Sequence, residues 1–420
     1  MTAAILALNK RTFASLAYRN YRLYFMGQVV SVTGTWMQNI AMAWLILDLT
    51  HSPVAVGALA LCQFLPFTVF GLFAGTVVDR FDPRRLVIWT QAASMVLAAG
   101  LAIPALLGQA TPWIVYLAAG LRGAVLVLDA PSRQALTFQM VGPRELPNAV
   151  ALNSSLFNAA RVIGPTLGGA LVAIAGAGFC FAFNAVSFLA VLAGLLAMRR
   201  DELLPPERNG ERPRLLRGTR EALHYVRRTP RAGVILLLVA VVSTFAFNFN
   251  VLLPVLAKET LNSGPATFGV VTGCFGAGAL VGALLAATLG RASIRAMVAA
   301  MTLFGVSEFL LAPLHSVATT GAALFVVGLS FTMWTANANS TLQLEAPGHL
   351  RGRVVGLYYY AFNGAGPVGG LLAGWLAAVG GTGLAFAVGG AVTVAAVLVA
   401  LPALVSRPAV RLAQLLSFKL

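Results

Sequence analysis

Long apolar stretches separated by short polar intervals make up most of this 420-residue chain. Twelve of them are long enough to cross a bilayer as a helix, which needs about 20 mostly apolar residues. The first six lie near 20–47, 54–78, 86–107, 112–130, 148–175 and 179–198. The other six lie near 232–256, 266–290, 296–314, 320–343, 354–378 and 383–404. The pattern predicts an all-α membrane protein of twelve transmembrane helices.

One longer hydrophilic interval divides these helices into two sets of six. We expect an N-terminal six-helix bundle over 1–198, a cytoplasmic linker over 199–231 and a C-terminal six-helix bundle over 232–420. In the linker, apolar and arginine residues recur at helical spacing, which is typical of an amphipathic helix. Such a helix can lie on an anionic membrane surface, and a solvated linker explains the same pattern equally well.

Composition and charge fit a membrane protein of defined orientation. Hydrophobic residues make up 59% and charged residues 10% of the chain, whereas about 25% is charged in an ordinary globular protein. The net charge of +16 does not indicate a nucleic-acid partner, because the basic residues lie in the termini and in alternate connections. The three exceptions among the 29 Lys and Arg are Lys258, Arg122 and Arg161. The positive-inside rule therefore predicts an inner (plasma) membrane protein with both termini in the cytoplasm.

The two sets of helices carry a shared pattern of small residues. The fifth stretch contains Gly164, Pro165 and Gly168, and the eleventh contains Gly366, Pro367 and Gly370. Equivalent patterns in the fifth helix of each set indicate a duplicated, pseudo-symmetric six-helix unit. Glycines four residues apart form a flat stripe that a neighbouring helix can approach closely. We expect these stripes, with similar ones in the second and eighth helices, to form the surfaces along which two halves slide; generic packing is the alternative.

Several motifs resemble those of a known family of membrane proteins. The stretch Gly75-Thr-Val-Val-Asp-Arg-Phe-Asp-Pro-Arg-Arg resembles the loop signature of the major facilitator superfamily, except that Asp82 stands where the superfamily usually has Gly. The Gly-Pro-x-x-Gly-Gly of the fifth helix resembles its antiporter motif. Arg19-Asn-Tyr-Arg, Gly34-Thr-Trp-Met-Gln and Asp129-Ala-Pro-Ser-Arg-Gln-Ala resemble the transmembrane secretion effector subgroup, which includes siderophore and macrolide exporters. The resemblance implies the major facilitator fold and proton-coupled export of a small organic molecule.

The loop signature implies a cytoplasmic gate made of Asp79, Arg80, Arg84 and Asp129. A carboxylate at Asp79 can face the positive N-terminal end of another helix, which the resemblance identifies as the eleventh. The resemblance also implies that Arg84 pairs with Asp129 at the end of the fourth helix. Charges that merely fix the orientation in the membrane are the alternative explanation.

Polar stripes on apolar helices predict a central substrate cavity. In superfamily members the first, fourth, seventh and tenth helices line this cavity, and here each of them carries polar residues on one face. Lipid disfavours such faces, so they contact protein or water; helix–helix hydrogen bonding without substrate contact is equally consistent. The expected cavity residues are Gln28, Thr35, Asn39, Arg122, Thr244, Asn248, Trp334 and Asn337.

Charged residues inside the spans are candidates for mechanism. Arg122 lies in the middle of the fourth helix, where an arginine costs at least about 2.5–3.5 kcal/mol, and it can attract an acidic substrate or form a structural ion pair. Arg161 flanks the glycine stripe of the fifth helix. Asp129 and Glu308 are the candidate proton-coupling residues.

Other function classes find no support in the sequence. No phosphate-binding loop, metal-ligand spacing or catalytic constellation is present, so we expect neither an enzyme nor a cofactor or metal. The leading prediction is a monomeric secondary transporter that exports a siderophore or a drug-like compound by alternating access. An importer or lysolipid transporter of the same fold, and a non-transporting membrane receptor, are the alternatives. The expected partners are a small-molecule substrate, protons and the lipid bilayer.

Overall fold

The computed structural model describes residues 13–78, 80–205, 215–289, 292–348 and 350–405, without the side chains of 75, 76, 215–219 and 405. The first helices are α2 (Arg19–Thr50), α3 (Pro53–Phe70), α4 (Ala74–Val78), α5 (Pro83–Leu106), α6 (Pro112–Ala175) and α7 (Ala177–Leu196). The later ones are α8 (Leu215–Arg228), α9 (Pro230–Phe245), α10 (Phe249–Val255), α11 (Pro265–Leu289), α12 (Ile294–Leu311), α13 (Val317–Glu345), α14 (Arg351–Gly364) and α15 (Gly366–Val405). Short turns of other helix types are η1 (Ala14–Ala17), η2 (Gly71–Phe73), η3 (Arg200–Glu202) and the π-helix η4 (Leu256–Thr260).

Within these described ranges, nine helical segments are long and apolar enough to cross a membrane. Two of them, Pro112–Ala175 and Arg351–Leu404, are interrupted by non-helical glycines, at Gly142 and at Gly380–Gly381. Gly142 and Gly381 adopt φ values of 69° and 71°, which L side chains rarely take, so the chain can reverse there. The 32-residue α2 is not among the nine segments. Dividing the two broken segments and counting α2 would give the predicted number of spans, and that number stays a prediction.

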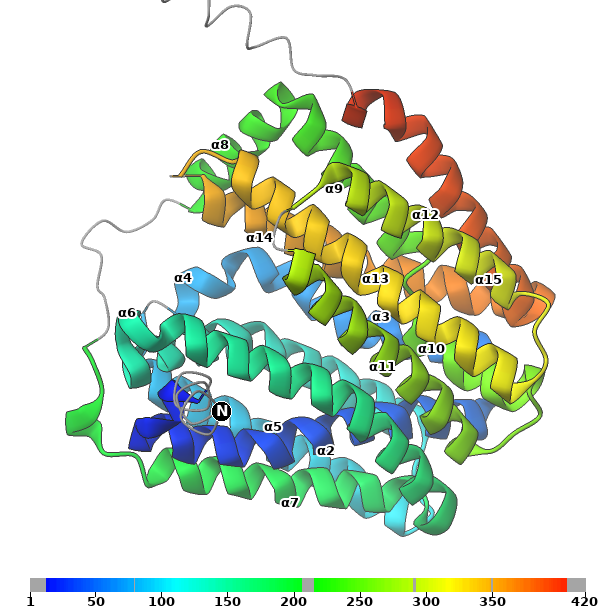
Figure 1. The fold of residues 1–420 in the computed structure, drawn as a ribbon. Coiled ribbons are helices and arrows are strands. Elements are labelled where there is room, and N and C mark those ends of the chain that lie inside the picture. Colours follow the sequence, from blue (N-terminus) through cyan, green and yellow to red (C-terminus); the bar gives the residue numbers. More distant parts are fainter. Residues whose placement is uncertain (1–12, 79, 206–214, 290–291, 349, 406–420) are drawn as a thin grey trace, which may run out of the picture.

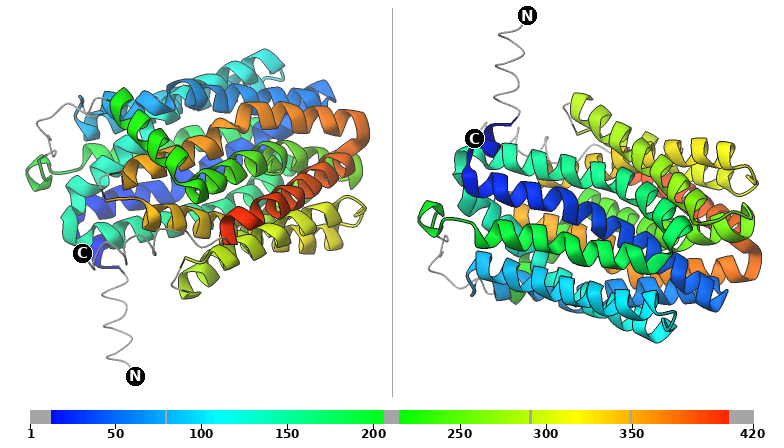
Figure 2. Two further views of the ribbon diagram at one scale, coloured as in Figure 1. Left: turned by 90° about the horizontal axis from the view of Figure 1, so that it is seen from above. Right: turned by 90° about the horizontal axis from the view of Figure 1, so that it is seen from below.

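The helices form two groups that lie against each other. One group consists of α2, α3, α5, α6 and α7, and the other consists of α9, α11, α12, α13, α14 and α15 (Figure 1). The helices run roughly parallel across the molecule, as expected of a membrane bundle (Figure 2). The predicted division at 199–231 lies between α7 and α9, and the domain limits stay a prediction, because helices of the two groups also contact each other extensively.

Glycines bring the two groups into close contact along two helix pairs, α6 with α11 and α3 with α15. A Cβ on Gly169 of α6 would lie 2.7 Å from the Cα of Gly269 in α11. A Cβ on Gly57 of α3 would lie 2.5 Å from the carbonyl oxygen of Gly370 in α15. At these crossings the backbones therefore touch directly, which explains why both pairs are rich in glycine.

The predicted glycine stripe of α6 faces a different neighbour from the one we expected. Gly164 and Gly168 pack against α2 in their own group, where a Cβ would lie 2.5 Å from Trp36 Cβ and 2.9 Å from Met37 Cα. The next residue, Gly169, faces the other group instead, about 100° further round the helix. In contrast, Gly366 and Gly370 of α15 do face the other group, where they meet Phe64 and Ala60 of α3.

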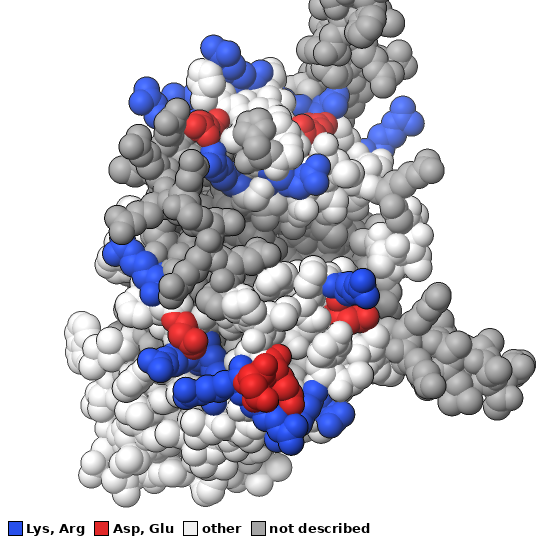
Figure 3. Space-filling view, turned by 90° about the vertical axis from the view of Figure 1, so that its left-hand side faces the viewer, with Lys and Arg blue, Asp and Glu red and all other residues white. Residues whose placement is uncertain are grey.

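Charged side chains gather at one end of the molecule, which we call the arginine-rich end. It lies on the left of Figure 1, where α4, α6 and α8 are found. Figure 3 faces this end and shows an upper and a lower set of Lys, Arg, Asp and Glu side chains. The ribbons of the two groups spread apart toward it in Figure 1 and converge toward the opposite end, which we call the far end.

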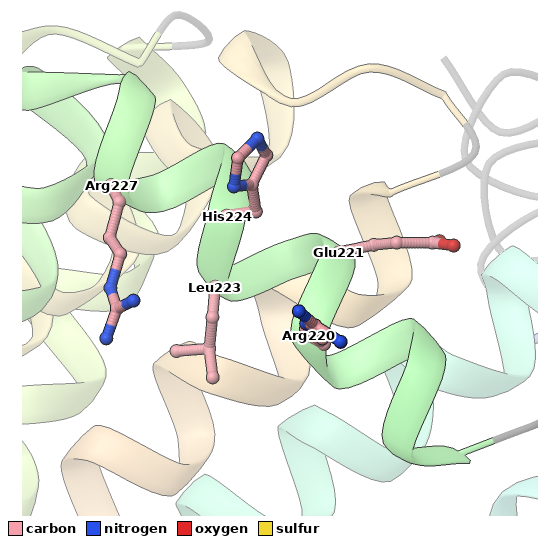
Figure 4. A pocket seen from close by; sticks show the side chains of 5 residues that line it. All are labelled: Arg220, Glu221, Leu223, His224 and Arg227. Atoms are coloured by element: carbon pink, nitrogen blue, oxygen red, sulfur yellow. The ribbon is translucent and has the colours of Figure 1, made fainter.

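The linker helix α8 packs on protein and not on lipid alone. Ala222 is fully buried, the Tyr225 hydroxyl donates to the carbonyl oxygen of Glu345 over 2.9 Å, and Glu221 forms an ion pair with Arg353. The outer face of α8 carries a shallow hollow of about 450 Å³ lined by Arg220, Glu221, Leu223, His224 and Arg227 (Figure 4). The amphipathic pattern thus reflects docking onto the ends of α13 and α14 with a basic face outward.

The contact between Gly169 and α11 predicts that a side chain larger than that of glycine does not fit at position 169. Gly169→Ala would place a Cβ 2.5 Å from the carbonyl oxygen of Pro265, so α6 and α11 would have to separate. Such overpacking costs about 1–3 kcal/mol, and we expect a lower thermal unfolding temperature for the purified protein. Gly100→Ala is the matched control, because nothing lies within 4 Å of its Cβ position. Equal unfolding temperatures for the two variants would contradict the contact.

Candidate functional site

Two of the predicted cavity residues meet in the interior of the first group. Arg122 of α6 donates a hydrogen bond from NH1 to Oδ1 of Asn39 on α2, with a distance of 2.7 Å. Both side chains are half-buried. Both residues were expected to line the cavity, and that role stays a prediction. The amide oxygen of Asn39 supplies one neutral acceptor for a guanidinium that carries a full charge.

A second arginine lies where the two groups meet. The guanidinium carbon of Arg161 on α6 lies 5.9 Å from the ring centre of Trp36, 5.0 Å from that of Phe275 and 5.5 Å from that of Phe331. Trp36 belongs to α2, whereas Phe275 and Phe331 belong to α11 and α13 of the other group. Cation–π attraction of this kind is worth about 2 kcal/mol or more where water is excluded.

Phenylalanine side chains extend this contact into the second group. The rings of Phe247 and Phe331 stack with 4.3 Å between centres, and Phe362 lies 5.1 Å from Phe247. Phe247 sits at the break between α9 and α10, where the backbone leaves the helix. These aromatic residues could not be predicted from the sequence, because apolar side chains in an apolar helix carry no signal of their own. We call Asn39, Arg122, Trp36, Arg161 and Phe331 the central site.

A buried polar network lies beside the central site on the same group. Asp129 of α6 accepts hydrogen bonds from Thr90 over 2.6 Å and from Gln91 over 2.8 Å, both on α5. It also forms an ion pair with Arg133, which in turn donates to Gln28 of α2. Gln28 and Asp129 are 3% and 4% exposed, so the network ties α2, α5 and α6 together inside the group.

The predicted pair between Arg84 and Asp129 is wrong. The Nε and NH2 atoms of Arg84 donate to the carbonyl oxygen of Leu195 at the end of α7, over 3.0 and 2.7 Å. Arg84 starts α5, whereas Asp129 contacts α5 at residues 90 and 91, about 9–10 Å further along the helix axis. Arg80 is exposed, and its role in the gate stays a prediction. Asp79 lies outside the described residues.

The predicted cavity residues of the second group contact neighbouring helices of that group, and Asn337 also lines a hollow of about 360 Å³. Trp334 is fully buried among Phe304 and Phe331, and Asn337 accepts a hydrogen bond from the backbone N–H of Ser293 at the start of α12. Thr244 and Asn248 lie at the break between α9 and α10, where Asn248 donates to the carbonyl oxygen of Thr244. Their contribution to a cavity is therefore not supported by these contacts. Thr35 of α2 is half-buried.

Glu308 of α12 is an isolated acid in the second group. Its side chain is 0% exposed, and neither carboxyl oxygen has a hydrogen-bond partner among the described residues. It lies beside α15, because a Cβ on Gly389 would be 3.1 Å from its Oε1. Within the same described ranges, no three His, Cys, Asp or Glu side chains lie close enough to hold a metal ion.

The far end is held by an ion pair that joins the two groups. Lys258 of η4 donates to Oδ1 of Asp48, near the end of α2, over 2.8 Å. The Lys258 ammonium also lies 5.6 Å from the ring centre of Trp44, which stacks on Phe268 of α11. These contacts close the far end. Lys258 was one of the three basic residues that the sequence placed outside the termini and the arginine-rich connections.

The architecture and the central site define a class of membrane protein. The fold is similar to that of a POT family transporter solved with 5-aminolevulinic acid, with a TM-score of 0.73, 12% identity, and 92% of this chain and 97% of that chain covered. The molecule thus has the major facilitator fold of two helical bundles. It belongs to the transmembrane secretion effector family, which its sequence matches over residues 10–415.

Two relatives illustrate the family. The staphyloferrin A transporter of Staphylococcus aureus is 23% identical over 382 residues, covering 89% of this chain and 93% of that protein. The multidrug efflux pump Tap of Mycolicibacterium fortuitum is 27% identical over 371 residues, covering 86% and 89%. Family and relatives are transporters, so this chain is a multi-pass membrane transporter and not an enzyme.

The contacts of Arg84 predict a structural role for this residue. Arg84→Gln would leave the last carbonyl groups of α7 without their charged donor, and we expect a loss of about 1.5–3 kcal/mol of stability. Arg85→Gln is the matched control, since Arg85 is its exposed neighbour. Thermal unfolding of the purified variants measures the difference. Equal stability of both variants would argue against the anchor on α7.

The far-end ion pair predicts a rescue by charge exchange. Asp48→Lys and Lys258→Asp should each open the contact between η4 and α2, because like charges then face each other. The double variant should restore it, with a coupling energy of roughly 0.2–1 kcal/mol for such a partly exposed pair. Hydrogen exchange of the backbone amides of residues 256–260 reports the opening. Failure of the double variant to slow the exchange again would exclude the pair as a closing contact.

Proposed function

We propose that this protein is a secondary exporter of small organic molecules in the inner membrane, siderophore-like or drug-like, which works by alternating access. The observation that carries the proposal is the position of Arg161. Its side chain belongs to one group of helices, and two of its three ring partners belong to the other. Any movement of one group against the other therefore changes the central site, and alternating access requires this coupling between movement and binding.

The contacts at the far end fit a state in which the site is reached from the cytoplasm, through which an exporter and an importer both pass. The arginine-rich end faces the cytoplasm if the positive-inside rule holds, with both termini on that side. The far-end contacts of Lys258 and Trp44 would then seal the site from the periplasm in this state. A substrate from the cytoplasm would enter first, as an exporter needs. The names of the staphyloferrin A transporter and of the efflux pump Tap favour an organic substrate.

Proton coupling is part of the proposal and has two candidate carriers. Asp129 lies beside the central site, and its neighbour Arg133 would retain a polar partner in Gln28 if the carboxyl were protonated. Glu308 has no hydrogen-bond partner among the described residues, and leaving an ionised carboxyl in such a place is costly. One helical turn before it, Phe304 lies 6.1 Å from Phe331 of the central site. A change of charge at either acid could thus affect the site.

Everted membrane vesicles test the function directly. We expect vesicles that contain the protein to accumulate members of a labelled panel of siderophores and antibiotics when respiration acidifies their lumen. Dissipating the proton gradient should abolish the accumulation, and Asp129→Asn or Glu308→Gln should separate transport from the gradient at normal protein abundance. Vesicles without the protein are the control. Uptake only into right-side-out vesicles would show an importer, and no uptake in either orientation would contradict transport of these compounds.

A further inference from the structure

The two interior arginines approach the same face of α2. Arg122 contacts Asn39, and Arg161 contacts Trp36. Residues three apart on a helix are neighbours on one side, about 4.5 Å along its axis. Both guanidinium groups therefore converge on adjacent turns of α2, although 39 positions separate them in the sequence. Two like charges thus lie beside the same stretch of α2.

Neither arginine has an acidic partner among the described residues. Arginines 133, 199, 231 and 353 do form ion pairs with carboxylates, whereas the contacts of Arg122 and Arg161 are an amide and three rings. The next acid after Arg122 along α6 is Asp129, which Arg133, Thr90 and Gln91 already engage. An arginine at membrane depth is costly unless something compensates its charge. Asp129 also attracts Arg122 electrostatically, without contacting it, and among the described residues Arg161 has rings alone as partners.

The geometry leaves hydrogen-bond donors available at both arginines. A guanidinium has five N–H donors in one plane, and Arg122 uses one nitrogen for Asn39. The three aromatic rings attract the positive charge of the Arg161 guanidinium. Among the described residues, no hydrogen bond uses the N–H groups of Arg161. Both side chains are half-buried and not sealed. Such edges bind carboxylates in a bidentate manner.

We propose that Arg122 and Arg161 form one anion-binding site that takes the carboxylate groups of an acidic organic molecule. The proposal rests on the proposed transport function and specifies its substrate class. Carboxylates would lie against the two guanidinium edges near α2. The remaining, less polar part of the molecule would lie against Phe331 and its stacked neighbour Phe247. A substrate with several carboxylates would bridge both arginines and so both turns of α2.

Binding of a simple polycarboxylate tests the site without knowledge of the natural substrate. The purified full-length protein in detergent is titrated with citrate and with its neutral trimethyl ester at constant ionic strength, by calorimetry and by thermal unfolding. We expect citrate to bind and to raise the unfolding temperature, and the ester to do neither. Arg122→Gln and Arg161→Gln should each weaken citrate binding about tenfold or more, since a charge-assisted hydrogen bond is lost. Arg161→Lys, which keeps the charge, should weaken it less.

Arg227→Gln provides the matched control, because it removes an exposed arginine of α8 and should leave citrate binding unchanged. Variants are compared only if they elute as the wild-type monodisperse peak, and Arg161→Lys replaces Arg161→Gln if the latter does not. Equal effects of citrate and its ester, or undiminished binding in the arginine variants, would overturn the proposal. That result would mean that Arg161 merely holds the two groups together. Vesicle uptake of uncharged compounds in the same preparation would still support transport, so the two proposals can fail separately.

Discussion

Direct backbone contact between two helix bundles is the constraint on which the rest of this structure depends. Lipid chains are as apolar as leucine side chains, so helices in a bilayer associate through close packing and not through the hydrophobic effect. Gly169 and Gly269 allow that packing where α6 crosses α11, and Gly57 and Gly370 allow it where α3 crosses α15. Because α6 lies this close to α11, Arg161 reaches Phe275 and Phe331 in the other bundle. The packing of glycines thus determines the composition of the central site.

The charged residues in the interior are of two kinds, which differ in the hydrogen-bond and ion-pair partners that the protein gives them. Asp129 and Arg133 satisfy each other and are anchored by neighbouring polar side chains, which makes them part of the framework of their bundle. Arg122 and Arg161 have neutral partners, and these provide weaker compensation than a carboxylate would. A charged residue that stabilises the bundle and a charged residue that is available to a ligand can therefore lie on the same helix. Their hydrogen-bond partners distinguish them better than their depth in the membrane does.

The sequence predicted the fold and part of the site, and the reasons for the misses are physical. Helical phase identified the polar faces of single spans, and the structure pairs Asn39 with Arg122, which lie on two of these faces. Phase does not predict which neighbouring helix covers a face, and the ring of Trp334 packs against Phe304 of α12. The rings around Arg161 come from three helices. Contacts of this kind depend on tertiary arrangement, which a periodic pattern does not contain.

The strengths of the contacts between the bundles determine which end can open. The ion pair of Asp48 with Lys258 at the far end is partly exposed, and such pairs contribute about 0.2–1 kcal/mol. The glycine crossings bury backbone against backbone and would lose many close contacts if they separated. Gly169 meets Pro265 and Gly269 in the first turn of α11, which follows η4 at the far end, so the far end opens only if this crossing separates together with the ion pair. The rings contributed by the second bundle would then shift around Arg161.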